Sequence, residues 1–204
     1  MRNASVWQRV LGLVGVVIEG MAFDERLDGI VVSVRPRKGA RRRCGRCGRR
    51  ASWYDRGQGR RRWRALDLGT VRVWLEADVP RVSCPVHGVT VVQVPWARHD
   101  AGHTRAFDDT VAWLAVQCSK TAVTELMRIA WRTVGAIVAR VAEDAMAGVD
   151  RFDGLRRIGI DEISYKKGHK YLMVVVDHDA RRLVWAAAGR TSATVDEFFD
   201  LLGV

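Results

Sequence analysis

Hydrophobic and polar positions change their period several times along the chain, and each change predicts a new element. Alternation at Val71, Val73 and Leu75 predicts a strand, because successive side chains of a strand point to opposite faces. Two further β-rich runs, residues 16–23 and 30–34, are joined by a DERLDG link that favours a turn, so they predict a β-hairpin. The first hundred residues are therefore predicted to be β-rich.

The period becomes helical after residue 104. Phe107, Val111, Leu114 and Ala115 form one apolar stripe at helical spacing. Cys118 follows the same helix and is expected to be a small buried hydrophobe.

Two more helical stripes, between residues 119 and 141, predict a helix-turn-helix. The residues expected to line the inner sides are Ala122, Leu126 and Ile129 in the first helix and its turn, and Val134, Ile137 and Val141 in the second. We expect Trp131, Arg132, Thr133 and Ala136, near the leading end of the second helix, to face a DNA major groove. The alternative is a helical hairpin that only packs a core. Arg128 stands where many such turns have glycine, and Ala130 replaces the usual Ser or Thr cap.

Three strands and a helix are predicted at the end of the chain, after a linker at residues 146–157. The strands are expected at 158–167, 171–177 and 183–189, and Val195, Phe198, Phe199 and Leu202 share one face of the helix. Asp161 and Glu162 interrupt the first strand, and a carboxylate there is costly to bury unless it is paired or bound to metal. This order is typical of the start of a ribonuclease H-like fold, which cleaves or transfers phosphodiesters with two metal ions held between carboxylates.

Asp177 is the one tempting partner for Asp161 within the chain. A two-residue loop pairs Lys167 with Lys170, sets Asp161 opposite Val176 and turns Asp177 to the other face. A loop one residue longer or shorter would bring Asp161 and Asp177 opposite each other. We expect Asp177 to serve as a turn residue at the strand end.

The charge distribution predicts that the protein binds a polyanion. The chain has 204 residues, 48% of them hydrophobic, and a formal net charge of +11. Residues 35–64, the arginine block, hold thirteen Arg and one Lys against one acid, so they carry +13 and the remainder −2. The residues expected to contact phosphates of double-stranded DNA are Arg41, Arg42, Arg43, Arg60, Arg61 and Arg62. The alternative is a solvated loop, but Trp53, Tyr54 and Trp63 inside the block favour nucleic acid.

Two paired motifs predict a structural zinc site. Cys44 and Cys47, and then Cys84 and His87, each present two ligands from one short turn. Two such turns close a tetrahedron around Zn²⁺ with no open position. The alternatives are four unrelated residues, or His99 or His103 in place of His87 as the fourth ligand.

The chain contains no uncharged apolar run of about 18 residues, so no membrane-spanning helix is expected. The apolar stretch at residues 10–18 is too short and lacks a small-residue cleavage site, so secretion and a disulfide framework are not expected. We expect a cytoplasmic protein.

The segments RRIGIDEISYKKGHKYLMVVVDHD, TAVTELMRIAWRTVGAIVARV, CGRCG and CPVHG, in this spacing, resemble the ISL-three family of bacterial DDE-type insertion-sequence transposases. The resemblance implies a zinc module, a helix-turn-helix and a ribonuclease H-like catalytic domain that uses Mg²⁺ or Mn²⁺. It places Asp161 as the first catalytic aspartate and a metal ligand, with the second Asp on a fourth strand and the Glu on a later helix. Because the sequence stops at Val204, before both, we expect an N-terminal portion or a truncated copy that binds DNA only.

The resemblance also implies binding to the terminal inverted repeats of an element as a homo-oligomer, at the bacterial nucleoid. The expected fold is α+β and multidomain. It comprises a zinc-binding β-rich domain at 1–100, a helix-turn-helix region at 101–148 and an incomplete ribonuclease H-like domain at 155–204. Two alternatives compete with the transposase: a zinc-containing DNA-binding regulator without catalytic activity, and a structural nucleic-acid module in which Asp161 and Glu162 are surface charges.

Overall fold

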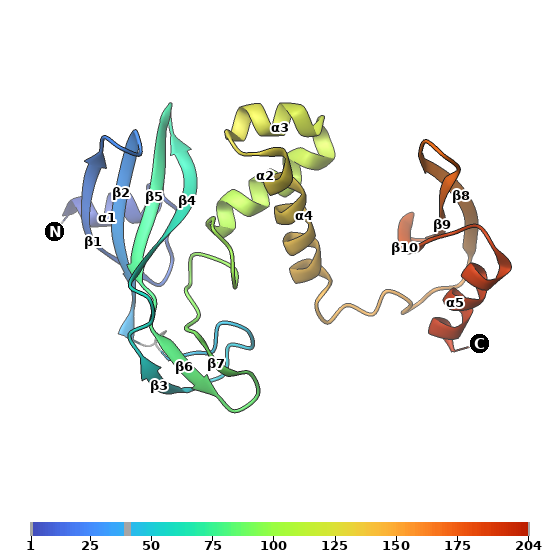
Figure 1. Cartoon of the computed structure of the whole chain (residues 1–204), viewed down its shortest axis with the longest axis horizontal. Helices are drawn as coiled ribbons and strands as arrows, with labels where there is room; N and C mark the ends of the chain where they lie inside the picture. Colours follow the sequence, from blue (N-terminus) through green and yellow to red (C-terminus); the bar gives the residue numbers. More distant parts are fainter. Residues whose placement is uncertain (1, 39–41, 204) are drawn as a thin grey trace. The chain divides into compact units, whose positions relative to one another are not determined.

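A computed structural model describes residues 2–38 and 42–203, and the side chains of residues 6–38, 42–165 and 167–203. The chain forms two compact units, Met1–Asp144 and Ala145–Val204. Figure 1 shows the elements of both units in chain order. Within the described residues, no helix is long enough and apolar enough to cross a membrane.

A four-stranded sheet forms the first part of the first unit, after helix α1 (Arg2–Val10). Its strands are β1 (Val16–Asp24), β2 (Gly29–Pro36), β4 (Arg60–Leu68) and β5 (Val71–Asp78), in the order β1-β2-β5-β4. The predicted hairpin is confirmed, because β1 and β2 pair antiparallel with Asp24 opposite Gly29. β2 then pairs in parallel with β5. A Cβ at Gly29 would meet the Arg72 carbonyl oxygen at 2.5 Å, so only glycine fits where these two strands begin.

Alternating positions of these strands build the core of the sheet. Val32, Trp63, Val73 and Leu75 are 2% exposed or less. Each such side chain contributes about 1.5–3 kcal/mol relative to an exposed one. The predicted alternation at residues 71–75 is thereby confirmed.

A smaller sheet in the same unit carries the cysteines. It consists of β3 (Ser52–Asp55), β6 (Arg81–Cys84) and β7 (Gly88–Val91), in the order β3-β6-β7 with antiparallel pairs.

Three helices complete the first unit: α2 (Arg105–Gln117), α3 (Lys120–Met127) and α4 (Trp131–Met146). The hydroxyl oxygens of Thr104 and Ser119 accept hydrogen bonds from the first turns of α2 and α3, so both helices begin at a side-chain cap. The residues buried between the three helices are Phe107, Val111, Val123, Met127, Val134 and Ile137.

The predicted inner face of α3 is wrong, although Ile129 in the turn that follows packs against the helix core as expected. Val123 and Met127 are buried, whereas Ala122 and Leu126 are exposed. α3 has apolar residues on two adjacent stripes, and its packing on α2 and α4 selects the second. Cys118 was also expected in a core, but it is the exposed C-cap of α2 and its thiol donates to the Leu114 carbonyl at 3.3 Å.

The helices are joined to the four-stranded sheet by polar contacts. Arg64 is only 4% exposed and forms an ion pair with Asp67, which also binds Arg128 of the α3–α4 turn. Arg128 donates a second bond, to the Thr70 carbonyl at 3.0 Å. The turn of the helix pair is therefore anchored to the β4–β5 hairpin.

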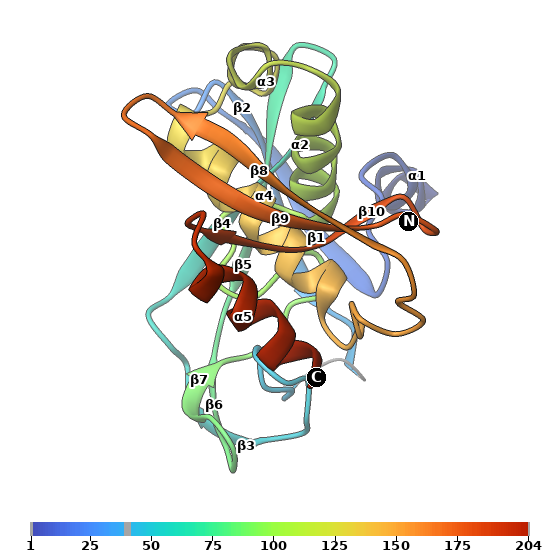
Figure 2. The same ribbon diagram turned by 90° about the vertical axis from the view of Figure 1, so that its right-hand side faces the viewer.

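The second unit contains the strands β8 (Ile158–Lys166), β9 (Lys170–Asp177) and β10 (Arg182–Ala188), then helix α5 (Ser192–Leu202). The order β10-β9-β8 is antiparallel throughout, so the three predicted strands and the helix are confirmed. Met173, Val175, Val184, Trp185 and Phe198 form its core. Figure 2 shows this sheet with α5 beside β10.

The register of β8 against β9 differs from the prediction. Lys166 pairs with Lys170 around a three-residue turn, a bulge follows, and Asp161 lies opposite Val174 instead of Val176. The pairing is therefore shifted by two residues, which leaves each side chain on its expected face. Asp177 pairs with Ile158 and lies on the face opposite to Asp161.

Candidate metal centre and nucleic-acid interface

Two glycine-ended turns bring the paired ligands together. In the first, the Gly48 amide donates to the Cys44 carbonyl at 2.9 Å, and Gly48 has a φ of +67°. In the second, Gly88 follows His87 with a φ of +64° and starts β7. A positive φ reverses the chain at no steric cost only for glycine, so both motifs can fold back tightly. The Gly45 amide donates to the Val91 carbonyl at 3.0 Å, which holds the first turn against the smaller sheet.

The four ligand atoms form a compact group. Cys44 Sγ lies 3.7 Å from His87 Nδ1, Cys84 Sγ lies 3.8 Å from the same nitrogen, and Cys47 Sγ lies 3.8 Å from Cys84 Sγ. All four atoms lie within 4.8 Å of one another. A tetrahedron with metal–sulfur bonds of about 2.3 Å has edges of about 3.8 Å, so three thiols and one imidazole fit Zn²⁺. A closed set of four protein ligands suits a structural ion.

The local electrostatics favour a thiolate. The backbone amides of Val86 and His87, together with the His87 side chain, lower the pKa of Cys84 to about 6. A thiolate is the form that binds metal, so one ligand is ready at neutral pH.

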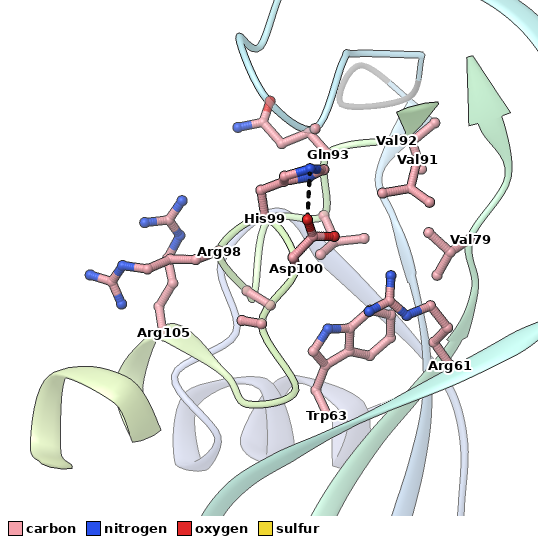
Figure 3. A pocket seen from close by; sticks show the side chains of 14 residues that line it. Arg61, Trp63, Val79, Val91, Val92, Gln93, Arg98, His99, Asp100 and Arg105 are labelled. Atoms are coloured by element: carbon pink, nitrogen blue, oxygen red, sulfur yellow. Dashed lines mark ion pairs between the residues drawn. The ribbon is translucent and has the colours of Figure 1, made fainter. Parts of the chain in front are cut away.

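The structure brings His87 into this group, and neither His99 nor His103. His99 lies 3.3 Å from the Asp100 carboxylate, and Arg46 donates to it at 3.4 Å. Figure 3 shows this ion pair at the edge of a small pocket of about 30 Å³ that Arg61 and Trp63 also line. His103 stacks on Phe107 with centroids 4.8 Å apart.

Arg60, Arg61 and Arg62 of the arginine block lie on β4 and point to different faces of the four-stranded sheet. Arg60 and Arg62 share the Glu76 carboxylate, at 2.9 and 2.7 Å. Arg61 points to the other face and lies 5.7 Å from the centroid of the Trp63 ring. Part of the positive charge counted from the sequence is therefore neutralised within the protein.

The other predicted phosphate ligands lie near the first cysteine turn. Arg42 is exposed, Arg43 donates to the Gly48 carbonyl at 2.9 Å, and Arg41 lies outside the described residues. Arg49 and Arg50, which directly follow this turn, are exposed as well. The sequence prediction did not single them out, although their position next to the CGRCG motif could have done so.

The leading end of α4 is free of the helix core. Trp131 is 56% exposed and Arg132 is exposed, while Thr133 is half-buried. Lys120 of α3 places its ammonium 4.6 Å from the centroid of the Trp131 ring. Val134 and Ile137 are buried on the opposite side, so α4 presents an outer face to solvent as the helix-turn-helix prediction requires.

Asp161 is exposed on β8, and its carboxylate accepts a hydrogen bond from the Glu162 amide at 2.7 Å. Asp177 is buried and caps its own turn by accepting from the amides of Asp179 and Ala180, as expected of a strand-end residue. These bonds hold the pKa of Asp177 below its usual value. In the described part of the chain, the one group of three or more possible metal ligands is the cysteine–histidine group. Asp161 alone offers too few oxygen ligands for Mg²⁺.

Three family models match successive stretches of the chain. They are described as a zinc-finger of transposase IS204/IS1001/IS1096/IS1165 over residues 40–87, a helix-turn-helix domain of transposase family ISL3 over residues 92–142, and a transposase over residues 158–203. The resemblance stated from the motifs is therefore confirmed.

Two kinds of relative are similar to this chain. The transposase for insertion sequence element IS1557, from two strains of Mycobacterium tuberculosis, is 65% identical over 208 residues, which cover 100% of this chain and 47% of the relative. The transposase for insertion sequence element IS1001 from Bordetella parapertussis is 26% identical over 143 residues, 70% of this chain and 35% of the relative. The chain thus spans about half the length of the IS1557 transposases, and its match to the IS1001 transposase spans about a third of that protein. No solved structure matches it.

Proposed function

Because this chain resembles the ISL3 transposases in its zinc, helix-turn-helix and transposase segments alike, we propose that it is the DNA-binding portion of an insertion-sequence transposase. The zinc-binding module and the helix-turn-helix bind the double-stranded terminal inverted repeats of the element, and the chain assembles there as a homo-oligomer at the nucleoid. The three-domain division at residues 1–100, 101–148 and 155–204 is part of the proposal.

One observation carries the DNA-binding role. α4 buries Val134 and Ile137 while Trp131 and Arg132 at its leading end remain exposed, and Arg128 fixes the preceding turn to the sheet. A helix that is held from one side and exposed on the other is what major-groove recognition needs. Arg132 is the residue best suited to a base edge, because a guanidinium can bind guanine with two hydrogen bonds.

The second unit is proposed to be the beginning of a ribonuclease H-like catalytic domain. Three antiparallel strands followed by α5, with Asp161 on β8, support this role. In the whole transposase, Asp161 supplies one of the carboxylates that hold Mg²⁺ or Mn²⁺, and the bound ions stabilise the attacking and leaving oxygens of strand cleavage and transfer.

DNA-binding measurements on residues 1–204 can separate sequence-specific contacts to bases from contacts to phosphates. Binding to an element-end duplex should weaken about tenfold or more between 50 and 200 mM salt. Arg132→Ala should remove the preference for element ends over unrelated duplex, since a good base contact contributes about 1–3 kcal/mol of discrimination. Equal affinity of the wild-type chain for both duplexes would count against sequence reading by α4.

The two halves of the arginine block provide a matched comparison. Arg49→Gln/Arg50→Gln should lower the slope of log affinity against log salt by up to about 2, since each lost phosphate contact removes about 0.9. Arg60→Gln/Arg62→Gln should lower it less, because Glu76 already neutralises part of their charge. An affinity that does not change with salt rules out the electrostatic role.

A zinc-containing DNA-binding regulator remains the second candidate. It is favoured by the isolation of Asp161, which joins no group of metal ligands within the described residues. The two candidates differ in one measurement, the Mg²⁺-dependent joining of element ends by a downstream-extended chain.

A further inference from the structure

A cavity of about 330 Å³ lies between β1, the end of β2, the start of β4, the end of β5, strand β3 and the segment that follows β7. This volume falls at the lower end of the range for small-molecule pockets, about 300–1,000 Å³. Its lining belongs wholly to the first unit, and neither the four metal-binding side chains nor any residue of α4 is part of that lining.

One wall of the cavity is aromatic. Trp53 of β3 lines it and is 48% exposed. Its neighbour Tyr54 does not line the cavity and instead lies under Arg81, 5.3 Å from the guanidinium to the ring centroid. Val34 and Val92, which are 1% and 8% exposed, add an apolar surface. A flat aromatic surface beside an apolar floor suits a planar, weakly polar ring.

The polar groups of the cavity include donors and acceptors. Arg35, Arg42 and Arg60 line it together with Glu19 and Asp78, a formal sum of +1. Arg35 is paired with Glu19 at 2.8 Å, and Arg60 with Glu76 at 2.9 Å. A site for a bare phosphate would carry more uncompensated positive charge. Carboxylates and the Gln93 amide can instead accept from the ring and exocyclic N–H groups of a nucleobase.

Arg42 differs from the other two arginines of the cavity in its charge pairing, because Arg35 and Arg60 each contact a carboxylate. It is exposed, and no ion pair joins it to another described residue. Its guanidinium can therefore bind the phosphate that accompanies a base.

We propose that this cavity holds one unpaired nucleotide of the bound DNA, with its base stacked on Trp53 and its phosphate against Arg42. The proposal rests on the DNA-binding function proposed above and adds a second mode of contact to it. A base inside a duplex cannot reach such a cavity, so the occupant is an unpaired end or an extruded base. Because any base can stack on an aromatic side chain, the site distinguishes an unpaired nucleotide from a paired one and does not distinguish one base from another.

The experiment compares two duplexes of the same sequence, one fully paired and one with a single bulged adenine, at fixed salt. The wild-type chain is expected to bind the bulged duplex more tightly. Trp53→Leu should weaken binding of the bulged duplex by roughly five- to a hundredfold, the loss of one stacked base, and leave the paired duplex unchanged within about twofold. Tyr54→Leu is the matched control, because it removes an exposed ring from the same strand outside the cavity, and it should keep the full preference.

Zinc content checks that each variant is folded. If Trp53→Leu loses zinc, Gln93→Ala replaces it, and this variant should also reduce the preference for the bulged duplex. Equal binding of both duplexes by the wild-type chain overturns the nucleotide site while leaving the DNA-binding function intact. An unchanged preference in Trp53→Leu, or an equal loss in Tyr54→Leu, also overturns it. Failure to bind either duplex overturns the proposed function itself.

Discussion

At the scale of single residues, Arg128 combines a costly backbone conformation with favourable side-chain contacts. Its φ of +53° and ψ of +49° lie in the left-handed region, which costs an L-residue about 1–2 kcal/mol. Its guanidinium binds Asp67 and the Thr70 carbonyl. Arg128→Gly and Arg128→Ala both lose these contacts, but only alanine keeps the strain. We expect Arg128→Ala to be less stable than Arg128→Gly by about 1 kcal/mol in urea denaturation. Equal stability of the two variants would show that the turn is unstrained.

Also at the scale of single residues, cysteine substitutions distinguish a zinc ligand from a cysteine that does not bind metal. Cys44 is fully buried in the group of four, whereas Cys118 is exposed and lies outside it. Cys44→Ser should release zinc and loosen the region around the arginine block, because metal binding and folding are linked at such sites. Cys118→Ser should retain the metal. Metal analysis of purified protein measures both, and stoichiometric zinc in a Cys44→Ser/Cys84→Ser variant would refute the assignment.

At the scale of elements, α2 is held by a buried polar group that includes His103 and Asp108. Asp108 is fully buried and its carboxylate lies 3.1 Å from Arg140 of α4. Burial raises the pKa of Asp108. Burial, together with the charges of Arg140 and Arg64, lowers the pKa of His103 to about 4. In the folded protein His103 therefore stays neutral at pH values where the unfolded chain has a protonated histidine.

This difference predicts a loss of stability in acid. Between about pH 6.5 and 4 the unfolded state binds a proton that folded His103 does not, so the free energy of unfolding falls as pH falls. The full effect is about 3 kcal/mol at most. His103→Gln should remove this part of the pH dependence, while the opposite contribution of Asp108 remains in both proteins. Denaturation curves at pH 7, 5 and 4 test it, and parallel pH profiles of the two proteins would contradict it.

At the scale of the whole molecule, the two units have separate cores and separate proposed tasks. The first unit holds the four proposed zinc ligands and the helix-turn-helix, and the second holds Asp161. For the polypeptide of residues 1–204 we expect DNA binding without cleavage or joining in Mg²⁺, because two ions about 4 Å apart need several carboxylate ligands. Asp161→Asn should leave DNA affinity unchanged. Cleavage by residues 1–204 that Asp161→Asn abolishes would show that further carboxylates are dispensable.

The sequence by itself determined the features that depend on residues close together in the chain. The strands of residues 158–188 and the hairpin of β1 and β2 follow from residue period and turn composition, which act over a few neighbours. The pairing of Cys44 with Cys47 and of Cys84 with His87 follows from spacing within one turn. The motifs were also sufficient for the resemblance to the ISL3 transposases.

Only the tertiary structure decided features that depend on residues far apart in the chain. α3 carries two apolar stripes, and packing against α2 and α4 buried Val123 and Met127 instead of the predicted pair. The three-residue turn and the bulge between Ser164 and Lys166 set Asp161 opposite Val174, because a hairpin register depends on the turn that forms as well as on the strands. Glu76, distant in sequence from Arg60 and Arg62, neutralises part of a block that composition counts as uniformly basic. The Trp53 cavity arises for the same reason, since its walls come from two sheets and from loop residues that are far apart in the sequence.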